Sequence, residues 1–167
     1  MKVSLIGAVG LTLMLFLKPA SADEAGFLKS IGGKWSGSGS VTTKIGSRAL
    51  NVTCHFDSKA RGPSLVMSGQ CRGLIVVRRA VSADIRANGT KYSGTYIGPS
   101  GRPSRLSGSR TGNSINFIVQ WSREINGDRT AQMTLEKIGV KGLRLKTTDK
   151  DPKSGRLVVT SDIRLTR

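Results

Sequence analysis

The sequence predicts an all-β protein, an antiparallel up-and-down β-barrel of about eight to ten strands with one short helical turn near its N-terminus. Apolar and polar residues alternate along most segments, which is typical of strands that bury one face. Pairs of Gly, Pro and Asn separate these segments at short intervals, as hairpin turns do. No helical crossover pattern stands between successive strands, and because parallel neighbours need such a crossover, the strands should run antiparallel.

Two turns, Asn88-Gly89 and Gly112-Asn113, predict which side chains face one interior. An Asn-Gly pair favours a two-residue loop because both central residues of a type I′ turn need a positive φ angle. Loops at these positions would pair Ile85 with Tyr92, Ala83 with Gly94, Val81 with Tyr96, Arg110 with Ile115, Gly108 with Phe117, Leu106 with Val119 and Ser104 with Trp121. A slip of one residue would turn every side chain to the other face, so the apolar matches support this register.

Residues 1–22 have the pattern of a secretory signal peptide. A lysine precedes an apolar run from Val3 to Leu17, and Pro19 and small residues up to Ala22 follow it. The alternative is a membrane anchor, but the run is shorter than the roughly 20 residues that a spanning helix needs. We therefore expect cleavage after Ala22, a single barrel domain over 23–167 with no transmembrane segment, and an exported location, periplasmic or secreted.

The two cysteines are predicted to form a disulfide bond. A hairpin centred on Gly62-Pro63 would place Cys54 directly opposite Cys71. In an exported protein, two cysteines that face each other are expected to be oxidised. The spacing does not fit a Cys-x-x-Cys redox or metal site, and His55, the only histidine, points to the opposite face of its strand.

The chain carries a formal net charge of +17, and its basic residues are spaced evenly. Such an excess favours attraction to polyanions, including nucleic acid, lipopolysaccharide, acidic polysaccharide or an anionic membrane face. A dedicated nucleic-acid binder usually concentrates its charge and interleaves aromatic residues, which make up only 5% of this chain. We therefore expect a solvated basic surface or a polyanion contact, and no dedicated nucleic-acid binding.

The first predicted strand opens with Gly33-Lys34-Trp35, soon after the expected cleavage site. This Gly-x-Trp motif resembles the calycin superfamily of lipocalins, fatty-acid-binding proteins and avidins, whose first strand often opens in this way. In lipocalins the tryptophan packs at the closed end of the barrel under an arginine from the last strand or its flank. The resemblance implies a calycin-like barrel in which Trp35 is structural and has Arg164 or Arg167 as its partner.

The segment 117–121, Phe-Ile-Val-Gln-Trp, and the segment Gly94-Thr95-Tyr96 are similar to two strands of the avidin family. Avidins pack a tryptophan of the next strand on biotin, whereas this chain has Thr130 to Met133 there and further strands after Trp121. The resemblance therefore implies the barrel and not the biotin ligand.

One inward row of apolar residues is interrupted by Arg79. The row consists of Ile75, Val77, Val81, Ala83 and Ile85. Either a bulge near 78–80 turns Arg79 outward, or its guanidinium projects into the barrel. An inward arginine is costly without a carboxylate, water or an anionic ligand, which makes Arg79 a candidate site residue.

An up-and-down order divides the connections between the two ends of the barrel. One end receives the tight turns, Trp35, the C-terminus and a helical turn within 23–33 whose Phe27, Leu28 and Ile31 would plug it. The other end, the mouth, receives 44–48, Arg72-Gly73 and the longer loops 98–104, 122–128 and 150–155. The mouth is rich in Lys and Arg, and long loops often carry function. The last strand is expected to point Leu157, Val159, Ile163 and Leu165 inward.

The first functional hypothesis is a barrel that binds a small anionic or amphipathic ligand, which enters at the basic mouth. Tyr92, Tyr96 and Trp121 would form its apolar walls. Arg79 and Arg110 would hold the negative group, because a few polar groups in an apolar cavity fix the orientation of a ligand. The alternative is that these rings fill the core, as they do in small barrels.

The second hypothesis is a solid-core interaction protein that binds an envelope polyanion or a partner protein through its basic surface. Exported barrel-type protease inhibitors offer an analogy. Catalysis has little support, because the acids fall mainly in loops or at outward positions and no nucleophile has an evident base. With no metal-ligand cluster and no phosphate-binding glycine loop in the sequence, we expect a non-enzymatic protein without catalytic residues, metal site or cofactor.

Overall fold

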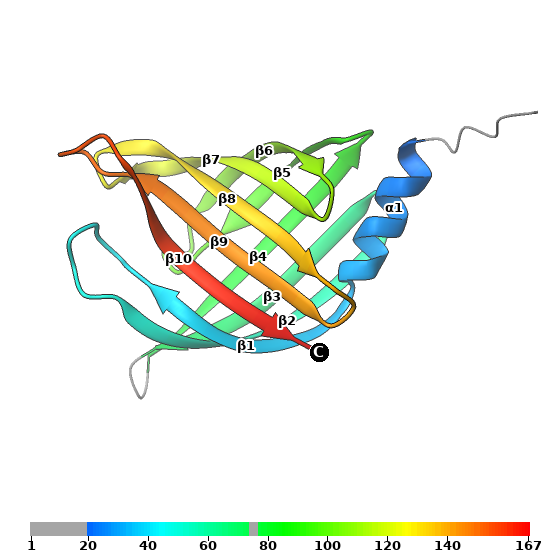
Figure 1. Cartoon of the computed structure of the whole chain (residues 1–167), viewed down its shortest axis with the longest axis horizontal. Helices are drawn as coiled ribbons and strands as arrows, with labels where there is room; N and C mark the ends of the chain where they lie inside the picture. The colour runs from blue at the N-terminus through cyan, green and yellow to red at the C-terminus, as the bar shows by residue number, and fades with distance from the viewer. Residues whose placement is uncertain (1–19, 74–76) are drawn as a thin grey trace, which may run out of the picture.

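Ten antiparallel strands close into a barrel, and one helix covers one of its ends (Figure 1). The computed structural model describes residues 20–73 and 77–167. The elements are α1 (Ala20–Ile31), β1 (Gly33–Val41), β2 (Leu50–Arg61), β3 (Ser64–Gly73), β4 (Val77–Asn88), β5 (Lys91–Ile97), β6 (Pro103–Thr111), β7 (Ser114–Ile125), β8 (Asp128–Ile138), β9 (Gly142–Lys150) and β10 (Leu157–Thr166). Each strand pairs with its neighbours along the chain, and β1 closes the barrel on β10. The predicted all-β up-and-down barrel is confirmed.

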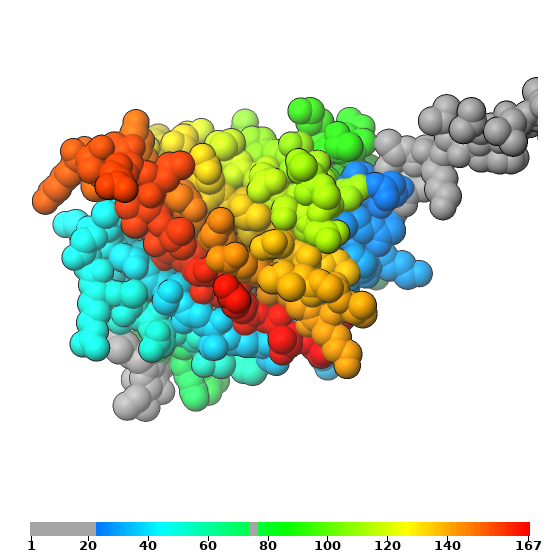
Figure 2. Space-filling model, in the orientation of Figure 1, coloured from blue at the N-terminus to red at the C-terminus, as the bar shows by residue number. Residues whose placement is uncertain are grey.

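Helix α1 lies at the closed end of the barrel, where it contacts β2, β3 and β4. The connections β1–β2 and β9–β10 lie at the far end, which is the mouth (Figures 1 and 2). Phe27, Leu28 and Ile31 of α1 are buried in the core, so the predicted plug is confirmed. The plug is a helix of 12 residues where the sequence suggested one short turn.

Trp35 anchors the helix to the first strand. Its Nε1 donates a hydrogen bond of 2.8 Å to the carbonyl oxygen of Ile31, and the guanidinium of Arg167 lies 4.7 Å from the centre of its ring. Of the two predicted candidates, Arg167 is therefore the partner of Trp35, and Arg164 is not. Because side chains alternate along β10 and Leu165 points inward, Arg164 is exposed on the outer face.

Two hairpins test the predicted registers. The β6–β7 hairpin pairs as predicted across Gly112-Asn113. The β4–β5 loop is Gly89-Thr90 and not Asn88-Gly89, because only Gly89 has a positive φ, of 54°, which fits a type II′ turn with glycine first. The observed pairs are Ala87 with Tyr92, Ile85 with Gly94 and Ala83 with Tyr96. The shift of two residues keeps every side chain on its predicted face, so Tyr92 and Tyr96 still point inward.

The predicted loop 122–128 is wrong. Strand β7 continues to Ile125 and turns at Asn126-Gly127, where both residues have positive φ angles of 52° and 94°. That pattern is the one a type I′ turn needs, and it leaves a tight hairpin at the mouth. The side-chain oxygen of Asn126 accepts a hydrogen bond of 3.0 Å from the backbone N–H of Ile45, which joins this hairpin to the β1–β2 loop.

In the first half of β10, the side chains point to the opposite faces from those predicted. Its register with β9 shifts between Val159 and Ser161, so Thr160 is the extra residue of a bulge. Leu157 and Val159 are 60% and 50% exposed, contrary to their predicted inward position, whereas Thr160 is buried. The extra residue at position 160 shifts the inward–outward alternation of side chains by one, so the residues that precede it point to the other face. Beyond the bulge, Ile163 and Leu165 point inward as predicted.

Pairing between β3 and β4 decides the position of Arg79. Arg72 and Gly73, which were predicted to form a turn, belong to β3. The predicted inward residue Ile75 lies within 74–76, outside the described residues. The β3–β4 register is continuous and has no bulge at 78–80. Of the two alternatives, Arg79 therefore takes the inward one.

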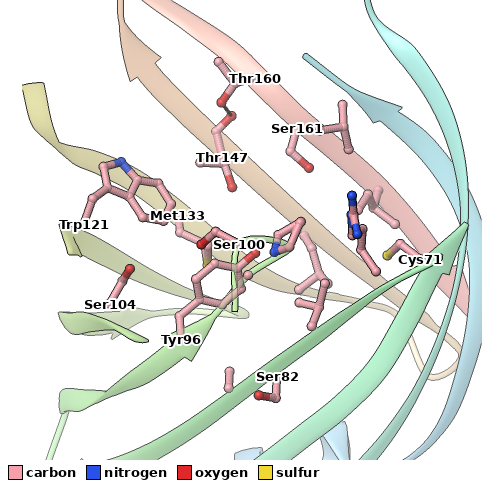
Figure 3. A pocket seen from close by; sticks show the side chains of 18 of the residues that line it. Cys71, Ser82, Tyr96, Ser100, Ser104, Trp121, Met133, Thr147, Thr160 and Ser161 are labelled. Carbon is pink, nitrogen blue, oxygen red and sulfur yellow. Dashed lines mark hydrogen bonds between the residues drawn. The ribbon is translucent and has the colours of Figure 1, made fainter. Parts of the chain in front are cut away.

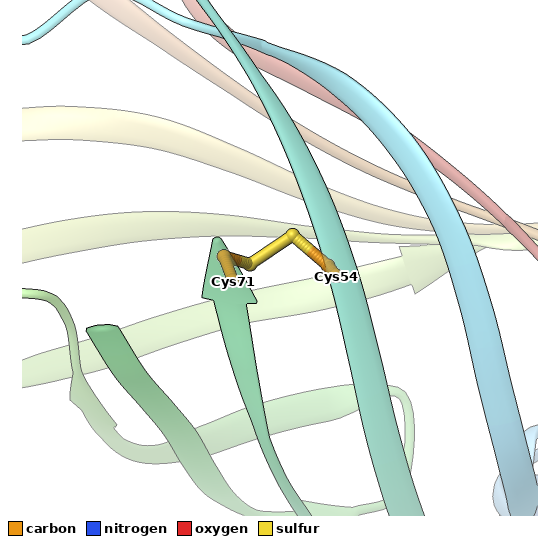
Figure 4. The surroundings of a disulfide bond; sticks show 2 residues. All are labelled: Cys54 and Cys71. Atoms are coloured by element: carbon orange, nitrogen blue, oxygen red, sulfur yellow. A yellow bond between two sulfur atoms is a disulfide. The ribbon is translucent and has the colours of Figure 1, made fainter. Parts of the chain in front are cut away.

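A disulfide bond joins β2 and β3 (Figure 4). Cys54 and Cys71 stand directly opposite each other, as the Gly62-Pro63 hairpin predicted, so this prediction is confirmed. Cys54 is fully buried and Cys71 lines the interior. His55 is exposed on the outer face.

The predicted signal peptide, 1–22, lies outside the described residues except for 20–22, which begin α1. Cleavage after Ala22 therefore stays a prediction. Among the described residues, no helix is long and apolar enough to cross a membrane.

Candidate ligand-binding cavity

The barrel encloses a cavity of about 530 Å³ that reaches the mouth loops (Figure 3). Apolar side chains form most of its inner wall, among them Leu65, Met67, Ile85, Phe117, Met133 and Ile163. Its volume lies within the range of sites that hold small organic ligands. The barrel interior therefore has room for a ligand, as the first hypothesis requires.

Three arginines and one carboxylate line the cavity: Arg79, Arg102, Arg123 and Asp149. Arg79 belongs to the wall, and Arg102 lies in the loop before β6. No carboxylate of the described residues forms an ion pair with Arg79. The cavity thus combines an apolar interior with a guanidinium that is free to meet an anion.

Two of the predicted aromatic residues, Tyr96 and Trp121, line the cavity from β5 and β7. Their ring centres lie 6.2 Å apart with an angle of 61° between the planes, an edge-on contact that Figure 3 shows on one side of the cavity. Burial raises the pKa of Tyr96 to about 12. Its hydroxyl therefore stays protonated at neutral pH and can donate a hydrogen bond.

Tyr92 and Arg110, predicted to contact the ligand, do not line the cavity, and this prediction is corrected. Both side chains hold α1: Arg110 Nε lies 2.8 Å from Glu24 Oε2, and the Tyr92 hydroxyl donates to the same carboxylate. The Arg110 guanidinium also lies 4.8 Å from the centre of the Phe27 ring. The two residues point inward as expected but lie at the closed end, where the helix takes up the space that a ligand would need.

Glu24 is the buried centre of this network, with only 1% of its side chain exposed. Burial alone would raise its pKa, but the hydrogen bonds from Arg110 and Tyr92 outweigh burial and lower the pKa below the ordinary value. Burial and the hydrogen bond to Glu24 raise the pKa of Tyr92. Glu24 therefore carries a negative charge at neutral pH, which balances that of Arg110.

One group of cavity residues was missed by the sequence analysis. We call it the polar wall and define it as Thr147 and Asp149 of β9 with Thr160 and Ser161 of β10, all of which line the cavity. The bulge of β10 turns Thr160 toward Asp149, whose Oδ2 accepts its hydroxyl at 3.3 Å. No alternation rule predicts this cluster, because the bulge that builds it breaks the alternation.

Asp149 is buried, with 3% of its surface exposed, and only half of its carboxylate is satisfied. Oδ2 also accepts a hydrogen bond of 3.1 Å from the Asn126 side chain, but Oδ1 has no partner in the described residues. The indole N–H of Trp121 is also buried and lies against the Asp149 carboxylate, but it does not reach the geometry of a hydrogen bond. Burial raises the pKa of Asp149 against the lowering effect of Asn126, Thr160 and Trp121. A buried donor and a buried acceptor therefore face each other in the cavity wall without forming a full hydrogen bond.

Among the described residues, no three or more His, Cys, Asp or Glu side chains are grouped so as to hold a metal ion. The side chains that line the cavity offer apolar contact, ion pairing through Arg79, and hydrogen bonds from Tyr96 and the polar wall. These are the means by which a protein holds an amphipathic small molecule.

No protein-family model and no curated protein sequence matches the chain. Its fold is similar to that of the crystal structure of Rv2717c from M. tuberculosis, with a TM-score of 0.67 and 16% sequence identity over 87% of this chain and 98% of that chain. At this identity the likeness concerns the fold alone. It supports the ten-stranded antiparallel barrel, and no family match supports the calycin resemblance.

Proposed function

We propose that this protein is an exported, non-enzymatic binding protein whose barrel holds a small amphipathic anion. The apolar part of the ligand occupies the cavity, and its negative group pairs with Arg79. The observation that carries this proposal is an apolar cavity of about 530 Å³ with an inward arginine that has no carboxylate partner among the described residues.

The energetics favour such a ligand. Each Å² of apolar surface removed from water contributes roughly 25 cal/mol, and the cavity wall is largely apolar. An arginine binds a carboxylate or sulfate through parallel charge-assisted hydrogen bonds.

Arg79 stands directly opposite Cys71, so the disulfide bond holds the strand beside it in place. The same disulfide bond fits the oxidising compartment of an exported protein.

Dodecanoate is a suitable first probe, measured by titration calorimetry with the mature protein. We expect Arg79→Met to weaken dodecanoate binding by about tenfold, a modest factor because the guanidinium is open to solvent. Methionine keeps much of the side-chain length and removes the charge. The matched control is Arg78→Met, which removes the same charge from the neighbouring exposed residue outside the cavity and should change the affinity by less than about twofold.

Salt separates this proposal from binding at the basic surface. Dodecanoate forms a single charge pair, so its affinity should fall only slightly between low and physiological salt, whereas binding through several surface arginines falls steeply with salt. Equal losses in the Arg78 and Arg79 variants together with a steep salt dependence would favour the polyanion or partner-protein alternative. No heat signal with dodecanoate, dodecyl sulfate or dodecanol would contradict the binding function itself.

A further inference from the structure

The bulge in β10 places polar groups inside the cavity and apolar groups outside it. Uninterrupted alternation would turn Leu157 and Val159 inward; instead they are 60% and 50% exposed, and Thr160 is buried against Asp149. Both changes oppose the hydrophobic effect. Bulges are frequent beside functional sites, where they redirect a side chain, and departures from the usual pattern concentrate there.

The polar wall has unused hydrogen-bonding capacity. No side-chain hydrogen bond of the described residues engages the hydroxyls of Thr147 or Ser161, although both residues line the cavity (Figure 3). Beside them, Asp149 Oδ1 and Trp121 Nε1 are a buried acceptor and a buried donor that face each other without reaching the geometry of a hydrogen bond. A buried polar group without a partner costs free energy, so a group that supplied these bonds would be bound favourably.

The polar wall faces Arg79 across the cavity. In the closed order of ten strands, β4 and β9 are five positions apart in both directions, so they form opposite sides of the barrel. A ligand whose acid group pairs with Arg79 on β4 must extend across the apolar interior to reach β9. Its second polar group would then meet Thr147 and Asp149.

Building on the proposed function, we propose that the polar wall binds a hydroxyl group of the ligand, which is therefore a hydroxylated amphipathic anion such as a hydroxy fatty acid. A hydroxyl both donates and accepts, so it can bond to Asp149 and to the indole N–H of Trp121 or to the hydroxyls between them. A second carboxylate would be repelled by Asp149. An ammonium group would leave the indole N–H unpaired, because it has no acceptor.

The test is a calorimetric comparison of dodecanoate with a panel of monohydroxydodecanoates in which the hydroxyl moves along the chain. At least one isomer should bind about tenfold more tightly than dodecanoate, which corresponds to one or two hydrogen bonds in a site that excludes water. Isomers that place the hydroxyl against the apolar wall should bind more weakly than dodecanoate, because their hydroxyl loses its water without a new partner.

Variants assign this preference to the polar wall. Thr147→Val and Ser161→Ala each remove one hydroxyl with little change in shape. Each should weaken binding of the best isomer more than binding of dodecanoate, so that the two ligands bind within about threefold of each other. The matched control is Ser104→Ala, which removes a hydroxyl from the cavity wall on β6 and should preserve the preference. If Ser104→Ala abolishes the preference and the two polar-wall variants do not, the assignment is overturned.

The outcomes distinguish this inference from the proposed function. Tight binding of dodecanoate with no isomer bound more tightly would keep the function and overturn the inference, because the polar wall would then hold only water. Failure of every member of the panel, dodecanoate included, would overturn both.

Discussion

Replacing Glu24 with glutamine should lower the free energy of unfolding by about 2 to 3 kcal/mol at pH 7. Glutamine keeps the shape of the side chain but removes the charge that balances Arg110 in a nearly water-free position. Asp23 also pairs with Arg110, but its side chain is 67% exposed and compensates poorly. Urea unfolding followed by far-ultraviolet circular dichroism would measure the change.

The outer face of the barrel provides the control. Arg144 and Asp162 form a similar arginine–carboxylate pair, with 2.6 Å between Nη2 and Oδ2, but both side chains are 27% exposed. Asp162→Asn should therefore cost less than about 1 kcal/mol. Equal losses in the two variants would show that burial does not strengthen the Glu24 network.

The pH dependence follows from the lowered pKa of Glu24. The unfolded chain titrates this carboxyl near its ordinary value of 4.5, and the folded protein titrates it lower. The stabilisation is therefore fully present above about pH 4.5 and is lost as the pH falls through the folded pKa. The stability difference between the wild type and Glu24→Gln should shrink below pH 4.5, and a difference that grows on acidification would contradict the assigned ion pair.

Removing the disulfide bond should destabilise the protein by about 3 kcal/mol. The bond closes a loop between residues 17 positions apart, and a cross-link of this length restricts the unfolded chain by that order. The double variant Cys54→Ala and Cys71→Ala avoids burying a new polar group at the fully buried position 54. Since Cys71 lies directly opposite Arg79, the variant should also bind dodecanoate more weakly.

Chemical reduction of the disulfide bond in the wild type provides a second test of its contribution to stability. Dithiothreitol should lower the urea midpoint of the wild type to about that of the double alanine variant and should leave the midpoint of the variant unchanged. A wild type with the same midpoint before and after complete reduction would show that the ten-stranded closure already holds β2 and β3 together without the bond.

The barrel and the disulfide bond were predictable because they follow from local rules. Alternation on β2 and β3, with a turn at Gly62-Pro63, was enough to set Cys54 opposite Cys71. The β4–β5 turn was predicted two residues out of register, yet Tyr96 kept its face because a shift of two preserves alternation. Alternation along β4 also predicted that Arg79 points inward unless a bulge intervenes, and the structure has no bulge there.

Local rules did not predict how far each inward side chain lies from the closed end of the barrel. Alternation states that Tyr92, Arg110 and Tyr96 point inward, but not that α1 fills the space beside the first two and leaves the third in the cavity. The bulge at Thr160 was also hidden, because one extra residue in a strand has no distinctive sequence signal when both neighbours are β-branched or small.

Alternation and turn residues were enough to predict most strands, their order, most inward faces and the pairing of the cysteines, since these depend on neighbours along the chain and on turns between adjacent strands. The folded barrel was needed to show which inward residues hold the helix, which line the cavity, and where β10 reverses its faces. The helix is held by Glu24 and Arg110, which lie 86 positions apart in the sequence, and the faces of β10 reverse at a bulge that sets Thr160 against Asp149 of the neighbouring strand.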